Sequence, residues 1–143
     1  MTIRLFRENG AGAHLEWYQK AASETFTFND VVGINTSGYI TKFVAGSAFP
    51  IIGLIQKAIA TTASDYASNT KVPVLVAGIE AEYLMDVDTG TAAQTDVGEY
   101  CDLVDHNGIN VGASSNNDVY VTQFVSAAIV VAKFVNKVGD IQE

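Results

Sequence analysis

Short apolar runs separated by turn residues constrain this fold more than any other feature of the sequence. In residues 25–28 the alternation of threonine and phenylalanine places Phe26 and Phe28 on one face of a strand. Residues 31–34 and 39–44 flank the turn Asn35-Thr36-Ser37-Gly38, and this arrangement predicts a β-hairpin. Gly53 lies in the middle of the β-branched run 49–62, which predicts a strand with a bulge or a close backbone approach.

The second half of the chain continues the strand pattern. Residues 71–88 hold Pro73 near their start, where an edge strand tolerates a missing donor, and Gly78 divides this run in two. Two more apolar runs, 118–126 and 128–136, close the chain. At least seven short strands predict an all-β fold, a small β-barrel or sandwich with short helical turns.

Helix is expected at only two places. Residues 15–22 are compatible with about two helical turns, and residues 91–100 with one turn that stops at Gly98. Residues 1–25 contain Gly10 and Gly12 and little periodic pattern. We therefore expect an extended N-terminal arm over residues 1–25, with a shell-binding role considered below, and a single β-barrel domain over residues 26–143.

Composition supports one folded unit. The 143 residues are 48% hydrophobic and 17% charged, which is enough apolar mass for a sizeable core. No apolar run reaches the roughly 20 residues that cross a bilayer, and no secretory leader pattern opens the chain. We expect a soluble product made in the cytoplasm, with no membrane partner. Cys101 is the only cysteine, so no internal disulfide can form.

Charge is distributed unevenly along the chain. Arg4 and Arg7 are the only arginines, and no lysine or arginine lies between Lys71 and Lys133. The net charge of -8 repels phosphate, which argues against direct nucleic-acid binding. Nine carboxylates in the long interval predict a solvated acidic surface: Glu80, Glu82, Asp86, Asp88, Asp96, Glu99, Asp102, Asp105 and Asp118.

The segment 99–110 gathers a cysteine, a histidine and several carboxylates. In a strand from 99 to 105, Cys101 shares a face with Leu103, and the Asn107-Gly108 pair predicts a type I′ hairpin turn with His106 pointing into solvent. A cysteine nucleophile needs a nearby cation or helix N-terminus, whereas the neighbours of Cys101 are acids. We interpret Cys101 as a buried structural residue.

Other chemistry has little support in the sequence. The two histidines lie far apart in the chain, so they suggest no zinc site, and the opening of a calcium loop at residues 86–90 lacks its third oxygen ligand and has Val97 at the twelfth position. Glu80 and Glu82 would share a strand face, as in a glycosidase or on any solvent-facing strand. No phosphate-binding loop or nucleophile elbow occurs. We predict no catalytic residue, no cofactor and no metal site.

The order of the elements resembles the head decoration, or cement, proteins of tailed bacteriophages. The resemblance covers roughly residues 28–136, and its elements follow one another as "FNDVVGINTSGYITKFVAG", "PIIGLIQKAI", "KVPVLVAGIEAEYLMDVD", "TDVGEYCDLVDHNGINV", "SSNNDVYVTQFVS" and "AIVVAKFVN". Each element alone is common in β proteins, so the resemblance rests on their order.

The resemblance implies a non-catalytic virion protein on the outer surface of an expanded capsid. It implies the major capsid protein as partner, self-association as a homotrimer, and stabilisation of the shell. In such proteins an N-terminal arm commonly adds a strand to the capsid protein. The candidate capsid-binding arm here is Ile3, Arg4, Leu5, Phe6 and Arg7.

Two alternatives remain open at this point. One is another virion component, such as a fibre, spike-base or tail-tube subunit. The other is a carbohydrate- or calcium-binding β module, for which Trp17, Tyr18, Asp86 and Asp88 are the available anchors. Trp17 and Tyr18 are adjacent, so on a strand they face opposite ways and cannot form one stacking platform.

Overall fold

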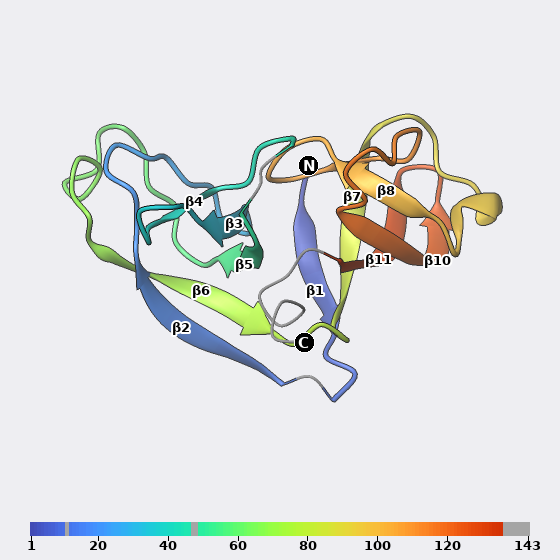
Figure 1. The fold of residues 1–143 in the computed structure, drawn as a ribbon, viewed down its shortest axis with the longest axis horizontal. Helices are drawn as coiled ribbons and strands as arrows, with labels where there is room; N and C mark the ends of the chain where they lie inside the picture. Colours follow the sequence, from blue (N-terminus) through green and yellow to red (C-terminus); the bar gives the residue numbers. More distant parts are fainter. Residues whose placement is uncertain (11, 47–48, 136–143) are drawn as a thin grey trace.

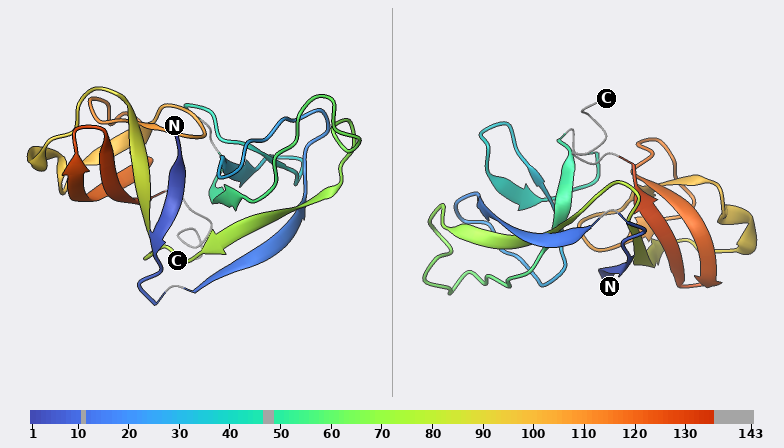
Figure 2. Two further views of the ribbon diagram at one scale, coloured as in Figure 1. Left: turned by 180° about the vertical axis from the view of Figure 1, so that it is seen from behind. Right: turned by 90° about the horizontal axis from the view of Figure 1, so that it is seen from below.

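The computed structural model describes residues 1–10, 12–46 and 49–135. The all-β prediction is confirmed, since the chain forms eleven strands and one short 3₁₀ turn over these residues. The strands make two sheets that lie side by side, as Figure 1 and the two further views in Figure 2 show. No helix in the described part of the chain is long and apolar enough to cross a bilayer.

The first sheet contains a closed β-barrel. Its strand order is β1-β7-β11-β10-β8-β9, and a parallel pairing between β7 and β9 closes a ring of five strands, with β1 outside the ring as a free edge. All its other pairings are antiparallel. The bounds are β1 Ile3–Arg7, β7 Glu82–Thr89, β8 Tyr100–Leu103, β9 Ile109–Asn110, β10 Val119–Ser126 and β11 Ile129–Phe134.

The second sheet is antiparallel and strongly curled. Its order is β2-β6-β5-β3-β4, and a single bridge between Lys20 and Ile40 brings the chain just after β2 against β4. The bounds are β2 Ala13–Gln19, β3 Val31–Ile34, β4 Ile40–Lys42, β5 Ile51–Ile55 and β6 Lys71–Ala77.

Two apolar clusters stabilise the molecule. The larger one fills the barrel and also includes residues of the second sheet, among them Val31, Ile51 and Leu54. The smaller one lies inside the curl of the second sheet and contains Ile40 and Val74. Because alternate residues of β3 and β5 contribute to different clusters, one sheet is packed on both of its faces.

The predicted β-hairpin forms as expected. Strands β3 and β4 pair across the turn 35–38, where the Asn35 side chain accepts hydrogen bonds from the Ser37 and Tyr39 amides. Gly38 takes a φ of 87° there, a left-handed conformation that favours glycine.

The predicted close approach at Gly53 is also observed. A Cβ at Gly53 would meet the Leu75 carbonyl oxygen of β6 well inside van der Waals contact. The edge-strand prediction for Pro73 was wrong, because β6 lies between β2 and β5. Gln56, just after β5, donates its amide to the Pro73 carbonyl, so the missing Pro73 donor falls at the end of the β5–β6 pairing and removes only the reciprocal bond to the Gln56 carbonyl.

The helix predictions have different outcomes. Residues 94–96 form the 3₁₀ turn η1, and Gly98 follows it with a φ of 90°, as expected. The helix predicted at residues 15–22 is absent, because residues 15–19 belong to β2, which pairs with β6 over seven residues. Pairing with a distant strand outweighs the weak local preference for helix.

The N-terminal segment also differs from the prediction. Residues 1–25 do not form an extended arm, since they supply β1 to the first sheet and β2 to the second. Ile3 is fully buried in the larger cluster. The apolar residues at positions 3 and 5 bury area that a free arm would leave in water, and this burial favours docking.

The hairpin near residue 107 is longer than predicted. Strands β8 and β9 do pair, and Val104 donates to the Gly108 carbonyl, but neither Asn107 nor Gly108 has a positive φ, so the turn is not type I′. Gly108 is required for a different reason: a Cβ there would lie 2.9 Å from the Asp88 Cβ.

The acidic stretch is only partly a solvated surface. Glu82, Asp102 and Asp118 are buried, while Glu80, Asp88 and Glu99 are exposed. Asp102 accepts the backbone amides of residues 115, 116 and 117, and Asp118 accepts that of Leu103, whereas Glu82 accepts side-chain donors. Folding therefore uses three of the nine acids as internal acceptors.

Candidate interaction surface on two edge strands

The five residues of the predicted capsid-binding arm form β1 and alternate between core and surface. Ile3 is fully buried and Leu5 packs against the same core cluster. Arg4, Phe6 and Arg7 remain about two-fifths exposed. The structure therefore divides the predicted site: two residues anchor the strand and three present side chains to solvent.

A β-bulge at Phe6 produces this arrangement. Ile3, Arg4 and Leu5 pair in register with β7, and the register then shifts so that Arg7 lies opposite Glu82. The extra residue places Phe6 and Arg7 together on the outside, where the Arg7 guanidinium lies 4.8 Å from the centre of the Phe6 ring.

Both arginines have partners within the molecule. Arg4 donates to the Thr2 hydroxyl at 2.9 Å and lies 4.0 Å from an Asp86 oxygen, and the same carboxylate accepts the Thr2 amide at 2.8 Å. Arg4 is held more weakly than Arg7, because its ion pair with Asp86 is long and exposed.

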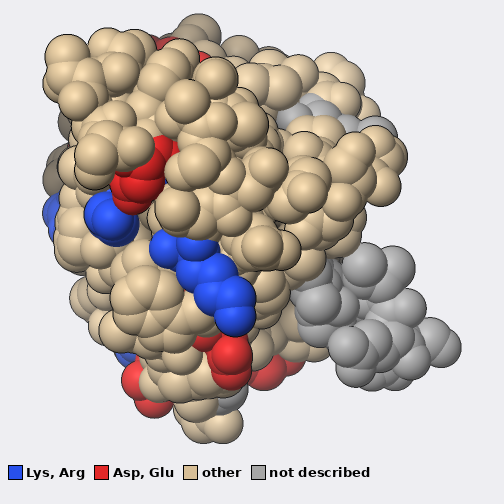
Figure 3. Space-filling model, turned by 90° about the vertical axis from the view of Figure 1, so that its left-hand side faces the viewer, with Lys and Arg blue, Asp and Glu red and all other residues tan. Residues whose placement is uncertain are grey.

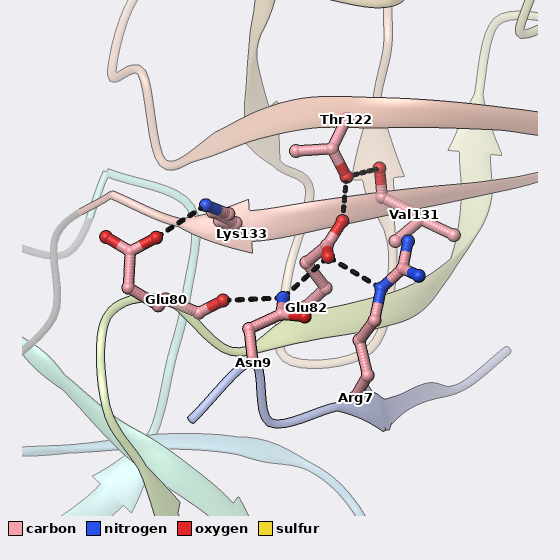
Figure 4. Close-up of polar contacts among 7 residues, drawn as sticks. All are labelled: Arg7, Asn9, Glu80, Glu82, Thr122, Val131 and Lys133. Carbon is pink, nitrogen blue, oxygen red and sulfur yellow. Dashed lines mark hydrogen bonds and ion pairs between the residues drawn. The ribbon is translucent and has the colours of Figure 1, made fainter. Parts of the chain in front are cut away.

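Arg7 belongs to a tighter cluster around Glu82, shown in Figure 4. One Glu82 oxygen accepts the Arg7 Nε at 2.7 Å and the Asn9 Nδ2 at 2.6 Å, and the other accepts the Thr122 hydroxyl of β10. Burial raises the pKa of Glu82, but the hydrogen bonds from Thr122, Asn9 and Arg7 outweigh it and hold that pKa below its usual value. The cluster fastens the segment after β1 to the barrel.

The outer edge of β1 has no described strand beside it, but it is accessible only at half-buried Leu5, because Ile3 is fully buried. The Thr2 carbonyl accepts the Asp86 amide, which shows that the even-numbered residues here face β7. Ile3 and Leu5 therefore direct their N–H and C=O groups to the opposite edge. No described strand pairs with that edge.

Strand β2 is a second edge, with no described strand beside it from Ala13 to Trp17, and sequence reasoning missed it because a helix was expected there. Leu15 and Trp17 are more than half exposed on one face of β2. The alternation of apolar Leu15 and Trp17 with polar His14 and Glu16 is the signal that could have identified this strand.

The carbohydrate- and calcium-binding anchors are not brought together. Trp17 is exposed, whereas Tyr18 points to the other face and packs against the smaller apolar cluster. The Asp86 carboxylate accepts a hydrogen bond from the Thr2 amide, and the Asp88 carboxylate accepts one from the Thr89 hydroxyl. Within the described residues no group of three or more histidine, cysteine or acidic side chains could hold a metal ion.

The other sequence candidates lie in the interior or between the sheets. Cys101 is buried in the barrel, and burial together with the neighbouring acids raises its pKa to about 11. His106 does not point freely into solvent: its Nδ1 lies 2.9 Å from an Asp105 oxygen and its Nε2 lies 3.7 Å from a buried Asp30 oxygen. The His106 carbonyl accepts the Val31 amide, so this residue joins the barrel to the second sheet.

The predicted glutamate pair is also separated. Glu80 is exposed and its carboxylate lies 2.9 Å from Lys133, whereas Glu82 is buried in the cluster described above. The two carboxylates therefore have different environments and different partners.

Charge follows the two-sheet architecture. The acid-rich stretch builds the barrel, whereas residues 12–79 carry equal numbers of lysines and carboxylates: Lys20, Lys42, Lys57 and Lys71 against Glu16, Glu24, Asp30 and Asp65. Figure 3, which views the left-hand side of Figure 1, shows a surface where neutral side chains predominate. Lys20 is fully buried and donates to the Tyr66 and Ser68 carbonyls at 2.8 and 2.7 Å.

No protein-family model and no curated protein matches this chain.

Proposed function

We propose that this chain is a non-catalytic structural protein of a tailed-phage virion. In this proposal it binds the outer surface of the expanded head through the major capsid protein and stabilises the shell. The observation that carries the proposal is the outer edge of β1 at half-buried Leu5, whose backbone donor and acceptor point away from β7, while the backbone of Ile3 is fully buried and anchors the strand.

In this proposal β1 receives a strand from the capsid protein, whereas the family resemblance implied that the N-terminal arm adds a strand to that protein. β1 is already paired along one edge and anchored by Ile3, so it is suited to receive a strand and not to leave as a donor. An extended capsid segment would add to its outer edge beside Leu5, with main-chain hydrogen bonds for affinity and Arg4 and Phe6 for side-chain contacts. Many copies on one shell supply avidity, so each contact can be small.

The barrel supports the same role. Its exposed carboxylates Glu80, Asp88 and Glu99 would make decorated particles repel one another, while Arg4 provides local positive charge beside the β1 edge.

The test is co-sedimentation of the purified chain with expanded heads that lack it, with unexpanded heads as a control. Saturable binding to expanded heads alone is expected. Binding to neither form would contradict the proposal and favour a tail, fibre or spike-base component.

One substitution locates the binding edge. Arg4→Glu should weaken binding by roughly tenfold, because it places a like charge beside Asp86 and an acid on the capsid-facing edge. Lys71→Glu is the matched control, since it makes the same charge reversal on an exposed residue of the second sheet. Arg7→Glu is unsuitable, because it would disrupt the Glu82 cluster. Equal binding by both variants would remove β1 from the interface.

A further inference from the structure

From Ala13 to Trp17 the outer edge of β2 presents backbone groups that no described strand pairs. Lys20, one residue beyond the strand, donates its amide to the Thr70 carbonyl at 2.9 Å, continuing the pairing of β2 with β6. The alternation of an antiparallel ladder then makes the even-numbered residues of β2 bond to β6. Four residues direct their N–H and C=O groups outward: Ala13, Leu15, Trp17 and Gln19. The bridge between Lys20 and Ile40 places β4 against this edge at Gln19, so the first three are the open positions.

Pro73 gives independent support for this assignment. It lies opposite Trp17, and its carbonyl accepts from Gln56 on the β5 side. A residue of a strand points its N and C=O to the same side, so the Trp17–Pro73 pair exchanges no hydrogen bonds and the Trp17 groups face outward.

Apart from the Glu16 charge, β2 lacks the features that normally protect an edge strand. It has seven residues in regular register, without a bulge, and contains neither lysine nor proline. Leu15 and Trp17 are 53% and 60% exposed beside this edge. A long, regular and apolar edge of this kind favours pairing with another strand.

We propose that β2 pairs antiparallel with β2 of a second copy, which forms a symmetric dimer with one continuous sheet. Outward-facing residues must pair with outward-facing residues, so the two-fold axis can pass through Leu15, Glu16 or Trp17. An axis at Glu16 places two Glu16 carboxylates opposite each other. An axis at Trp17 places two indoles opposite each other and leaves His14 without a partner.

Of the three possible axes, the one at Leu15 pairs complementary side chains across the interface. It places Leu15 opposite Leu15, Trp17 opposite the small Ala13, and His14 opposite Glu16 of the other copy, twice by symmetry. Within one chain the His14 Nε2 and the Glu16 Oε1 already lie 2.9 Å apart, so both side chains extend on the same face and can exchange partners across the axis. This interface is independent of the β1 edge and leaves it available for a capsid segment.

Sedimentation equilibrium of the full chain tests the proposal. Five residue pairs make a small interface, so we expect a monomer–dimer equilibrium with a dimer dissociation constant between about 1 µM and about 1 mM. Leu15→Lys should raise the dimer dissociation constant at least about tenfold, because two ammonium groups would meet at the axis. Gln19→Lys is the control, since this residue lies outside the five paired positions and should leave the constant unchanged.

A charge exchange tests the register itself. His14→Glu alone should weaken the dimer by roughly tenfold, and His14→Glu combined with Glu16→His should restore it. Thermal melts of each variant verify folding, since all the altered side chains are exposed. A monomer at the highest concentration, a trimer, or a dimer insensitive to Leu15→Lys would overturn the proposal.

Discussion

Removing the Glu82 carboxylate should destabilise the whole protein, although this residue contacts no ligand in the proposals above. Glu82 is 7% exposed and accepts hydrogen bonds from Arg7, Asn9 and Thr122. A hydrogen bond to a charged group contributes about 1.5–3 kcal/mol, but these three share one acceptor and are not additive. Arg7 is partly exposed and can be solvated when its partner is removed.

The burial of Glu82 and its three donors determine how much unfolding free energy each variant should lose. Glu82→Ala should cost about 3 kcal/mol of unfolding free energy, the lower end of the range for breaking a buried pair. For a chain of this size that corresponds to a decrease in Tm of about 10 °C. Glu82→Gln keeps the shape and one acceptor, and Thr122 can still donate to the Val131 carbonyl at 3.2 Å, so its cost should be about 1 kcal/mol.

The pH dependence follows from the lowered pKa of Glu82. A carboxyl whose folded-state pKa lies below its unfolded value stabilises the fold at pH values above the unfolded pKa. This stabilisation is lost as the pH falls through the folded pKa. The difference in Tm between the wild type and Glu82→Gln should therefore be largest near pH 7 and should shrink toward zero below about pH 4.

Urea unfolding and thermal melts followed by circular dichroism measure these effects. A double-mutant cycle between Arg7→Ala and Glu82→Ala should give a coupling above about 1 kcal/mol. The reasoning would be refuted if Glu82→Ala cost less than about 1 kcal/mol, or if the difference between wild type and Glu82→Gln grew on acidification.

Three further predictions concern the interior. Gly53→Ala should cost more than about 2 kcal/mol in urea unfolding, because its Cβ would overlap a β6 carbonyl, whereas Gly112→Ala should stay within about 0.5 kcal/mol of the wild type. Cys101, with a pKa raised to about 11, should react with a thiol reagent at pH 8 at least about a hundredfold more slowly in the folded than in the unfolded protein; equal rates would contradict its burial. Lys20→Met should cost about 2 kcal/mol and speed proteolysis of the adjacent loop, since three carbonyls lose their donor; an unchanged digestion pattern would argue against this role.

The sequence by itself determined the local features of this protein. Alternating apolar residues and glycine turns predicted the all-β class, the hairpin across residues 35–38 and the close approach at Gly53. The inward orientation of Cys101 followed from its neighbour Leu103. These features depend on side-chain alternation and backbone conformation within a few residues, which the sequence records directly.

Tertiary structure decided everything that depends on distant partners. β2 is a strand because β6 pairs with it, and residues 3–7 are a barrel edge because β7 lies beside them. The burial of Glu82 likewise depends on donors from two remote segments of the chain. Strand partners far apart in the sequence leave no local pattern. The sequence therefore indicated that strands would form, while only the fold determined which edges stay free for other molecules.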